Sequence, residues 1–437
     1  MEFLTRAHLS AEPTELELAN QRIAYEAACE GIVLLKNDGA LPLKNKRVAL
    51  YGGGAKRPIK GGTGSGEVNE RHSVTVEEGL RNRGFTIATE KWLEDFETFY
   101  AEAEAAYKVE KRKRLNLFKL HDIMQMLFDN FRTPAGPEIT GEYLSKETDS
   151  CVYVLARQAG EGGDRKAEKG DYLLTDEEVE AIRVCAGHYE KFVLVINCGS
   201  GMDLSALDGI EGINAILYIS QLGTEGGNAV ADILSGDVNP SGRLADTWAY
   251  RYEDIPFAME YGSLNGELEN EYYKEGIFVG YRYFDSFGIE PRFPFGYGLS
   301  YTDFAIRCTG VHADGTVLHL KAAVTNTGSR AGRQVAQLYV SAPEEGLNKE
   351  FQSLAAFAKT GELEPGQTEV LELSFDLREL ASYRERDGAF ILEGGDYVLR
   401  LGDSSRNTAA VAVVALPKEI VVSWHANICP LPEHMRL

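Results

Sequence analysis

The sequence predicts an α/β sandwich, a mostly parallel sheet with flanking helices, followed by an all-β sandwich. Up to about residue 250, short apolar runs of strand length alternate with helical patterns, as is typical of βα units. After residue 300, apolar and polar residues alternate with a period of two between turn signals. The 437 residues suffice for two or three domains that each bury a core.

The first half, residues 1–250, is predicted to form the α/β domain. Thr175 and Glu178 have the spacing of a capping box, which marks the start of a helix. Gly236, Pro240 and Gly242 then interrupt the pattern. The expected helices lie at 16–29, 74–80, 175–186 and 224–234, and the expected strands at 31–36, 48–51, 151–155, 192–197 and 215–219.

Residues 92–137 are predicted to be a helical insertion at one edge of this sheet, because they are rich in Ala, Glu, Lys, Leu and Phe. The insertion contains the basic run Lys111–Arg114. In a chain with a net charge of −22, such a run is interpreted as a solvated helix face rather than a nucleic-acid patch.

The second half begins with a connector, residues 251–303, that is dense in Tyr, Phe and Gly. Its aromatic side chains are interpreted as packing between domains, and a sugar-stacking surface remains the alternative. Residues 304–416 are predicted to form the β-sandwich, and 417–437 a C-terminal tail or linker. The expected strands of the sandwich lie at 317–324, 334–340, 369–375 and 396–401.

Charge and composition exclude several classes of function. Lys and Arg number 45 against 67 Asp and Glu, a net charge of −22 that opposes binding to nucleic acid or an anionic membrane. No apolar run approaches the roughly 20 residues of a membrane span. The N-terminus does not have the pattern of a secretory signal, which predicts a cytoplasmic protein. The six cysteines and eight histidines show no metal-ligand spacing, so no metal site is predicted.

Two glycine-rich segments lack the features of nucleotide-binding loops. Residues 51–54 do not have the GxGxxG spacing, and residues 61–66 are not followed by the Lys-Ser/Thr of a phosphate loop. A loop with so few side chains can instead bring backbone N–H groups close to an uncharged polar ligand such as a sugar. The candidate contacts in this loop are Gly62, Thr63, Gly64 and Ser65, and a plain tight turn is the alternative.

A third glycine-rich segment, Gln158–Arg165, directly follows the strand expected at 151–155. Ligands in open α/β sheets bind outside the carboxyl ends of strands, so Glu161 lies where a site is expected. With apolar shielding, the pKa of such a carboxyl rises enough for it to donate a proton near neutral pH. The alternative is an ordinary carboxylate in a surface loop.

Several long motifs resemble, in the same order along nearly the whole chain, the α/β-sandwich and fibronectin type III-like domains of glycoside hydrolase family 3, which includes many β-glucosidases. The resemblance makes the predicted β-sandwich a fibronectin type III-like (immunoglobulin-like) domain with a supporting role. The matching segments are Glu30–Leu43, Lys60–Asn69, Ala159–Arg165, Gly223–Asn228, Glu275–Asp285, Phe295–Tyr301, Asn326–Gly328 and Phe357–Thr360.

The resemblance implies a retaining glycosidase, β-glucosidase-like, in which Glu161 is the general acid/base. Asp164 and Arg165 match the same motif, with a loop-shaping or outer role. In the family the nucleophile is an Asp in a Ser-Asp-Trp-like motif on a separate (β/α)8 barrel, which also makes most sugar contacts. This sequence has no Ser-Asp-Trp, and Asp246-Thr-Trp248 is a poor substitute.

The remaining length also leaves no room for a barrel of roughly 250 residues. We therefore expect the chain to resemble the first part of a permuted member, to need a barrel in cis or in trans, and to be inactive alone. A truncated piece, a split gene and a true barrel-less protein all remain open. The reaction needs no metal or organic cofactor, because a pair of carboxyl groups suffices.

Two other functions stay open at this point. A non-catalytic carbohydrate-binding or scaffold protein would use residues 61–66 and the aromatic connector to contact a sugar. A nucleotide-binding α/β protein would require a phosphate loop that the sequence does not contain. The identity of the sugar, the linkage and the oligomeric state do not follow from the sequence.

Overall fold

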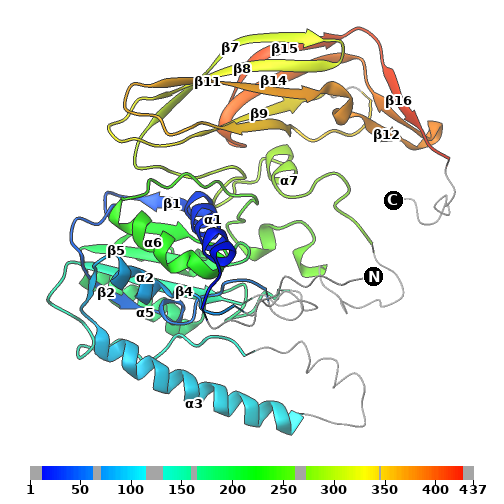
Figure 1. Cartoon of the computed structure of the whole chain (residues 1–437). Coiled ribbons are helices and arrows are strands. Elements are labelled where there is room, and N and C mark those ends of the chain that lie inside the picture. The colour runs from blue at the N-terminus through cyan, green and yellow to red at the C-terminus, as the bar shows by residue number, and fades with distance from the viewer. Residues whose placement is uncertain are drawn as a thin grey trace, which may run out of the picture. The chain divides into compact units, whose positions relative to one another are not determined.

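The computed structural model describes residues 12–62, 70–114, 131–158, 165–260, 272–343 and 346–426. The chain divides into two compact units, Met1–Gly242 and Arg243–Leu437 (Figure 1). The domain boundaries at residues 250, 303 and 416 stay predictions. Among the described residues, no helix is long and apolar enough to cross a membrane.

The first unit is built on a six-stranded sheet with the order β1-β6-β5-β4-β2-β3. All neighbouring strands are parallel except β1, which pairs antiparallel with β6. Strand β4 is buried along its whole length, as the apolar run in its sequence predicts. The strands are β1 (Val33–Asn37), β2 (Arg47–Tyr51), β3 (Thr86–Ile87), β4 (Ser150–Arg157), β5 (Lys191–Cys198) and β6 (Ile213–Tyr218).

The helices of this unit confirm the α/β pattern, and the capping box expected at Thr175 and Glu178 is present at the start of α5. Thr14 and Thr75 cap α1 and α2 in the same way. The α-helices are α1 (Glu15–Gly31), α2 (Val76–Asn82), α3 (Glu90–Arg114), α5 (Asp176–His188) and α6 (Gly226–Ser235), and the 3-10 turns are η1 (Gly53–Ala55), η3 (Ser205–Leu207) and η4 (Gly223–Glu225).

Helices α1, α2 and α6 are held together by backbone proximity and by one buried carboxylate. A Cβ atom on Gly79 of α2 would lie 2.0 Å from the carbonyl oxygen of Gly227 of α6, so the two helices approach too closely for any side chain there. The Asp232 carboxylate on α6 is 5% exposed and accepts hydrogen bonds from the Arg83 guanidinium, at 2.5 Å, and from the Tyr25 hydroxyl of α1.

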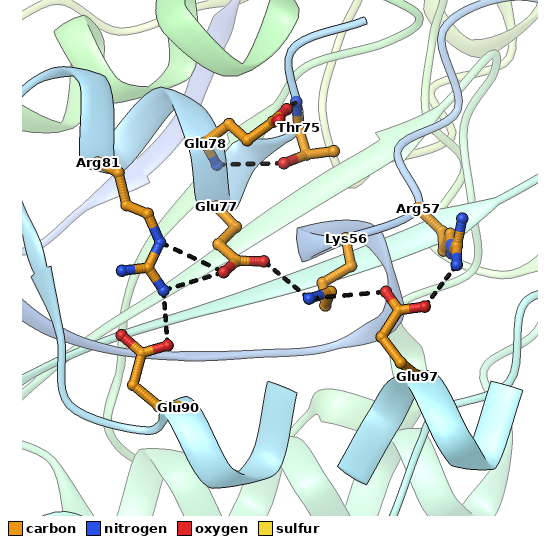
Figure 2. Close-up of polar contacts among 8 residues, drawn as sticks. All are labelled: Lys56, Arg57, Thr75, Glu77, Glu78, Arg81, Glu90 and Glu97. Atoms are coloured by element: carbon orange, nitrogen blue, oxygen red, sulfur yellow. Dashed lines mark hydrogen bonds and ion pairs between the residues drawn. The ribbon is translucent and has the colours of Figure 1, made fainter. Parts of the chain in front are cut away.

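An ion-pair network ties the start of α3 to α2 and to the segment after η1 (Figure 2). Glu77 on α2 contacts Arg81 at 3.0 Å and Lys56 at 3.2 Å, and Lys56 lies 3.6 Å from Glu97 on α3. Two further pairs complete the network: Arg57 with Glu97 at 2.5 Å, and Arg81 with Glu90 at 2.6 Å.

Helix α3 fills the first part of the predicted insertion, and residues 115–130 lie outside the described part of the chain. Near the end of this helix the Lys113 side chain is 69% exposed and pairs with Glu110 of the same helix at 3.5 Å. At this position the basic run lies on a solvated helix face, in agreement with the interpretation from net charge.

The second unit contains three antiparallel sheets, with the orders β10-β9-β14-β15, β11-β8-β7 and β12-β13-β16. Strand β8 alternates between buried and more exposed residues, which confirms the period of two. Its strands are β7 (Phe304–Asp314), β8 (Val317–Asn326), β9 (Val335–Ser341), β10 (Ser353–Lys359), β11 (Thr368–Asp376), β12 (Ser382–Arg384), β13 (Ala389–Leu392), β14 (Gly395–Ser404), β15 (Asn407–Leu416) and β16 (Ile420–Trp424).

The core of this unit consists of inward-facing aliphatic and aromatic residues of these strands, among them Leu320, Leu338, Leu373 and Tyr397. Strand β16 lies within the stretch that the sequence assigns to the tail, and it pairs with β13. The short helical elements are η5 (Tyr252–Asp254), η6 (Ala258–Glu260), α7 (Tyr281–Ser286), η7 (Leu377–Leu380) and η8 (Glu385–Asp387).

Aromatic residues of the connector pack within this second unit. The Tyr281 ring stacks on Phe295 with centroids 4.7 Å apart, and its hydroxyl accepts a hydrogen bond from Leu354 N at 2.8 Å. Phe293 makes an edge contact with the fully buried Trp248, which lies just before the connector. Tyr273, in contrast, is 86% exposed. Part of the connector therefore serves packing, and part of it faces solvent.

Candidate active site at the carboxyl edge of the sheet

The carboxyl ends of β2, β4, β5 and β6 lie at the same edge of the sheet, because these strands are parallel. The segments that follow them supply the predicted site residues. The structure describes two of these residues, Gly62 and Arg165. The other five, Thr63, Gly64, Ser65, Glu161 and Asp164, lie outside the described residues. What the structure shows is how the ends of the two glycine-rich segments are held.

Arg165 fastens the end of the segment 158–165 to the loop that follows β5. Its guanidinium donates to the Asp171 carboxylate at 3.0 Å and to the Asp171 carbonyl at 2.8 Å. It also donates to the Ser200 hydroxyl at 2.6 Å and to the Gly201 carbonyl at 2.9 Å. A further contact reaches Cys198 Sγ at 3.3 Å, and the side chain is only 15% exposed. All three nitrogens of the guanidinium therefore donate to protein acceptors.

A buried ion pair holds the other end of the same segment. Arg157 is the last residue of β4, and its guanidinium lies 2.6 Å from the Glu178 carboxylate, with both side chains 3% exposed. The same carboxylate accepts from Thr175 N at 2.8 Å in the capping box of α5. The sequence analysis missed Arg157. The available signal was a charged residue at the end of an apolar run, with a capping glutamate about twenty residues later.

Asn197 on β5 was also missed, and it contacts two other segments at this edge. Its side chain is 1% exposed. Its Oδ1 atom accepts from Ile59 N at 2.6 Å, and its Nδ2 atom donates to Ile59 O at 2.9 Å and to Ser220 O at 2.5 Å. A lone amide at the end of the apolar run 192–196 was the signal in the sequence.

Lys60, directly before the glycine-rich segment 61–66, and Val74, eight residues after it, both bond to the segment that follows β6. Lys60 O accepts from Gly223 N at 3.1 Å, and Val74 N donates to Thr224 O at 2.8 Å. The Lys60 ammonium group forms an ion pair with Glu70. This hydrogen bond holds the pKa of the Glu70 carboxyl below its ordinary value.

The glycines at this edge have different roles. Gly52 has a φ of +85°, and a Cβ atom there would lie 2.4 Å from Val154 O, so this glycine permits close packing against β4. Beside Gly62, no atom of the described residues lies within 4 Å of a Cβ position. Of these two glycines, Gly52 is therefore the one that close packing requires.

Asp246, Cys29 and Cys151, which the sequence analysis also considered, make none of the contacts described above for this edge of the sheet. Asp246, weighed as a substitute nucleophile, lies in the second unit and accepts a hydrogen bond from Trp248 Nε1 at 3.2 Å. The thiols of Cys29 and Cys151 are buried, and burial raises their pKa values. No group of three or more His, Cys, Asp or Glu side chains that could hold a metal ion occurs in the described ranges.

Two protein families match the sequence. Residues 32–281 match the family described as Glycosyl hydrolase family 3 C-terminal domain, and residues 334–405 match the Fibronectin type III-like domain. The first match covers more than half of the chain, and it includes every anchoring contact of the carboxyl edge described above.

Curated relatives are mostly β-glucosidases. β-Glucosidase A of Butyrivibrio fibrisolvens is 32% identical over 93% of this chain and 52% of the relative, and a β-glucosidase of Ruminococcus albus is 34% identical over 88% of this chain and 39% of the relative. An exo-α-(1→6)-L-arabinopyranosidase of Bifidobacterium breve is 27% identical over 94% of this chain and 51% of the relative. The chain spans about half the length of these relatives or less.

Solved structures with a similar fold are also β-glucosidases. β-Glucosidase 3B of Thermotoga neapolitana, in complex with α-D-glucose, is 35% identical with a TM-score of 0.77, over 92% of this chain and 55% of that one. A β-glucosidase of Paenibacillus barengoltzii is 34% identical with a TM-score of 0.81, over 92% of this chain and 44% of that one. The chain belongs to glycoside hydrolase family 3 and comprises its C-terminal α/β domain followed by a fibronectin type III-like domain.

Proposed function

We propose that this chain is part of a retaining glycoside hydrolase that removes terminal non-reducing β-D-glucosyl residues, with Glu161 as the general acid/base. The observation that carries the proposal is sequence identity of 30% or more to β-glucosidases over 88–93% of the chain. Two arginines flank the segment that contains Glu161: Arg157 is buried in its ion pair, and Arg165 is half-buried and bonded to Asp171. Such anchoring supports a role that requires a defined position.

The proposed reaction has two steps and needs two carboxyl groups about 5 to 5.5 Å apart. In the first, a nucleophilic carboxylate bonds to the anomeric carbon while the glycosidic bond breaks, and the Glu161 carboxylic acid gives its proton to the leaving oxygen. In the second, the Glu161 carboxylate takes a proton from water, whose oxygen displaces the nucleophile. The free sugar and the original protonation state result, so no metal or organic cofactor is needed.

The nucleophile is proposed to lie on a (β/α)8 barrel supplied in cis or in trans, and the chain alone is expected to be inactive. Gly62, Thr63, Gly64 and Ser65 are proposed to border the sugar, with Asp164 and Arg165 shaping the loop. The contacts of Arg165 support this loop-shaping role, because its donors are directed at protein acceptors. A cytoplasmic location stays a prediction.

The test is hydrolysis of p-nitrophenyl β-D-glucopyranoside by the purified chain, alone and mixed with a separately expressed family 3 barrel. We expect hydrolysis only in the mixture. Glu161→Ala should reduce hydrolysis of a poor leaving group far more than that of the activated aryl glucoside, because only the former needs strong protonation. Glu168→Ala, at an exposed carboxylate that pairs with Arg132, is the matched control and should have little effect.

Two results would contradict the proposal. Hydrolysis by the chain alone would show that a nucleophile lies on this chain. Equal losses on both substrates in Glu161→Ala would exclude the acid role. The relative described as an arabinopyranosidase makes p-nitrophenyl α-L-arabinopyranoside the natural comparison substrate. Faster hydrolysis of that substrate would leave the proposed mechanism intact and show that the preferred sugar is arabinopyranose rather than glucose.

A non-catalytic carbohydrate-binding function is the second candidate. The observation that favours it is the exposure of Tyr272, at 52%, and Tyr273, at 86%, because exposed aromatic rings can stack on sugar faces. Calorimetric titration of the isolated chain with a β-glucoside tests it. Binding that Tyr273→Ala abolishes, with no hydrolysis in any mixture, would favour this candidate over the enzyme.

A further inference from the structure

The Asn197 amide uses its hydrogen-bonding capacity on backbone groups that are distant in the sequence. It accepts from Ile59 N and donates to Ile59 O, 138 residues away, so it pairs with this residue as a neighbouring strand would. The second amide hydrogen goes to Ser220 O. Both hydrogens of Nδ2 and one acceptor position of Oδ1 are therefore engaged inside the protein.

The segment around Ser220 needs such support. Ser220 has a φ of 46°, a left-handed conformation that is unfavourable for a residue with a side chain. Ile219 N donates to Ile196 O at 2.9 Å on β5, and Gly223 N donates to Lys60 O at 3.1 Å. Strand β5, the segment 59–62 and the segment 219–223 thus form a closed ring of hydrogen bonds, in which Asn197 contacts both segments.

We propose that Asn197 is a positioning residue that sets the places of two segments at the candidate site, 59–62 and 219–223, relative to strand β5. The inference rests on the proposed function, because 59–62 leads into the loop proposed to border the sugar. No apolar residue can replace the amide, since it would leave Ile59 N and Ile59 O buried without the partners they have in Asn197, and would remove the donor to the half-buried Ser220 O. Aspartate would keep the acceptor and lose both donors.

The first experiment is hydrogen–deuterium exchange of the full chain, followed by mass spectrometry. In Asn197→Ala, we expect amide exchange in 59–62 and 219–223 to become at least tenfold faster, while exchange in β4 and β5 stays within twofold. In Asn197→Asp, the Ile59 amide should stay protected while 219–223 exchanges faster, because only the donors are lost. This separation by segment distinguishes positioning from general destabilisation.

The matched control is Asn214→Ala. Asn214 is another asparagine of this sheet, near the opposite edge, and its Oδ1 accepts from Phe192 N at 2.8 Å. This variant should leave exchange in 59–62 and 219–223 unchanged. Unchanged exchange of these two segments in both Asn197 variants would overturn the proposal, as would an equal increase across the whole sheet.

The link to the substrate is tested in the barrel mixture described above. Asn197→Ala should raise KM for p-nitrophenyl β-D-glucopyranoside at least tenfold, with a smaller effect on kcat, because the segments that border the sugar are no longer held. An unchanged KM together with faster exchange would overturn the role toward substrate. A mixture without any hydrolysis would contradict the proposed function but not the positioning role of Asn197, because the exchange rates do not depend on turnover.

Discussion

The two edges of the six-stranded sheet are held by different kinds of polar contact. At the carboxyl edge, Arg157 and Glu178 pair with 3% exposure each, and Asn197 is 1% exposed. At the amino edge, Arg47 pairs with Glu147, with 46% and 66% of the two side chains exposed. A buried polar group must keep its partner, whereas water can replace the partner of an exposed one. These buried contacts at the carboxyl edge are therefore harder to break than the exposed pair at the amino edge.

The buried polar contacts therefore lie at the edge of the sheet that carries the candidate site. The anchors at the carboxyl edge lie at the ends of the two glycine-rich segments, whose own residues have few side chains to hold them. The pairs at the amino edge, Arg47 with Glu147 and Lys191 with Asp149, involve no predicted site residue. Removing one partner of a buried polar contact strongly destabilises the fold. The position of these contacts next to the candidate site therefore supports a role in holding its segments.

The largest expected effect is the loss of the buried charge pair. Glu178→Gln keeps an oxygen for the capping box but leaves the Arg157 guanidinium buried without a counter-charge. We expect the free energy of unfolding, measured by denaturant titration, to fall by about 3–5 kcal/mol. Glu180→Gln on the same helix is the control, because Glu180 and its partner Arg183 are 55% and 56% exposed. It should cost less than about 0.5 kcal/mol.

A rescue experiment sharpens the same point. Replacing both partners, as Arg157→Met with Glu178→Leu, should recover much of the lost stability, because no unpaired charge remains buried. Equal losses in Glu178→Gln and Glu180→Gln would abolish the distinction between the buried and the exposed pairs.

A smaller effect is expected at Arg165, whose guanidinium bonds to several acceptors at once. A lysine at this position keeps the charge but cannot donate along so many directions, so Arg165→Lys should lower the free energy of unfolding by about 2 kcal/mol. Arg47→Lys at the amino edge is the matched change at an exposed pair, and we expect it to stay within about 0.5 kcal/mol. Chemical denaturation of both variants checks the difference, and indistinguishable midpoints would contradict it.

The smallest effect is expected at the amino edge, and it depends on pH. The Lys191 ammonium group, 2.7 Å away, and the Ser150 hydroxyl hold the pKa of Asp149 below its ordinary value. A carboxyl with a lowered pKa stabilises the folded chain above its ordinary pKa of about 3.9, and this contribution is lost as the pH falls through the lower folded value. Asp149→Asn should therefore cost less than about 1 kcal/mol at pH 7.

The difference between this variant and the wild type should shrink as the pH falls below about 4, and it should vanish once the carboxyl is protonated in both the folded and the unfolded chain. Thermal unfolding at a series of pH values measures it. A difference that persists at pH 2 would show that Asp149 acts through packing rather than through its charge.

Much of the fold follows from local patterns in the sequence. Strands β4 and β5 are recognisable as continuous apolar runs, β8 by its alternation, and the start of α5 by its capping box. Strand β3 was not predicted, because two residues are too few to show a pattern. Strand β7 was also missed, since its residues are exposed or half-buried throughout. The antiparallel direction of β1 has no signature in its own residues.

The residues of the candidate site also fall into two groups, those that the sequence suggested and those that only the structure revealed. Local sequence and family resemblance suggested Glu161 and the glycine-rich segments, because loop motifs are contiguous. Asn197 and Arg157 were not predicted, since their roles depend on partners 138 and 21 residues away. An isolated asparagine or arginine in a sequence does not reveal which backbone group it will meet.

The sequence by itself determined the α/β class of the first unit, the β class of the second, and the family, because hydrophobic periodicity and contiguous motifs are local properties. Only the tertiary structure decided which polar side chains anchor the carboxyl edge. Their hydrogen-bond partners come together when the strands align in register, and burial then makes each of these contacts obligatory.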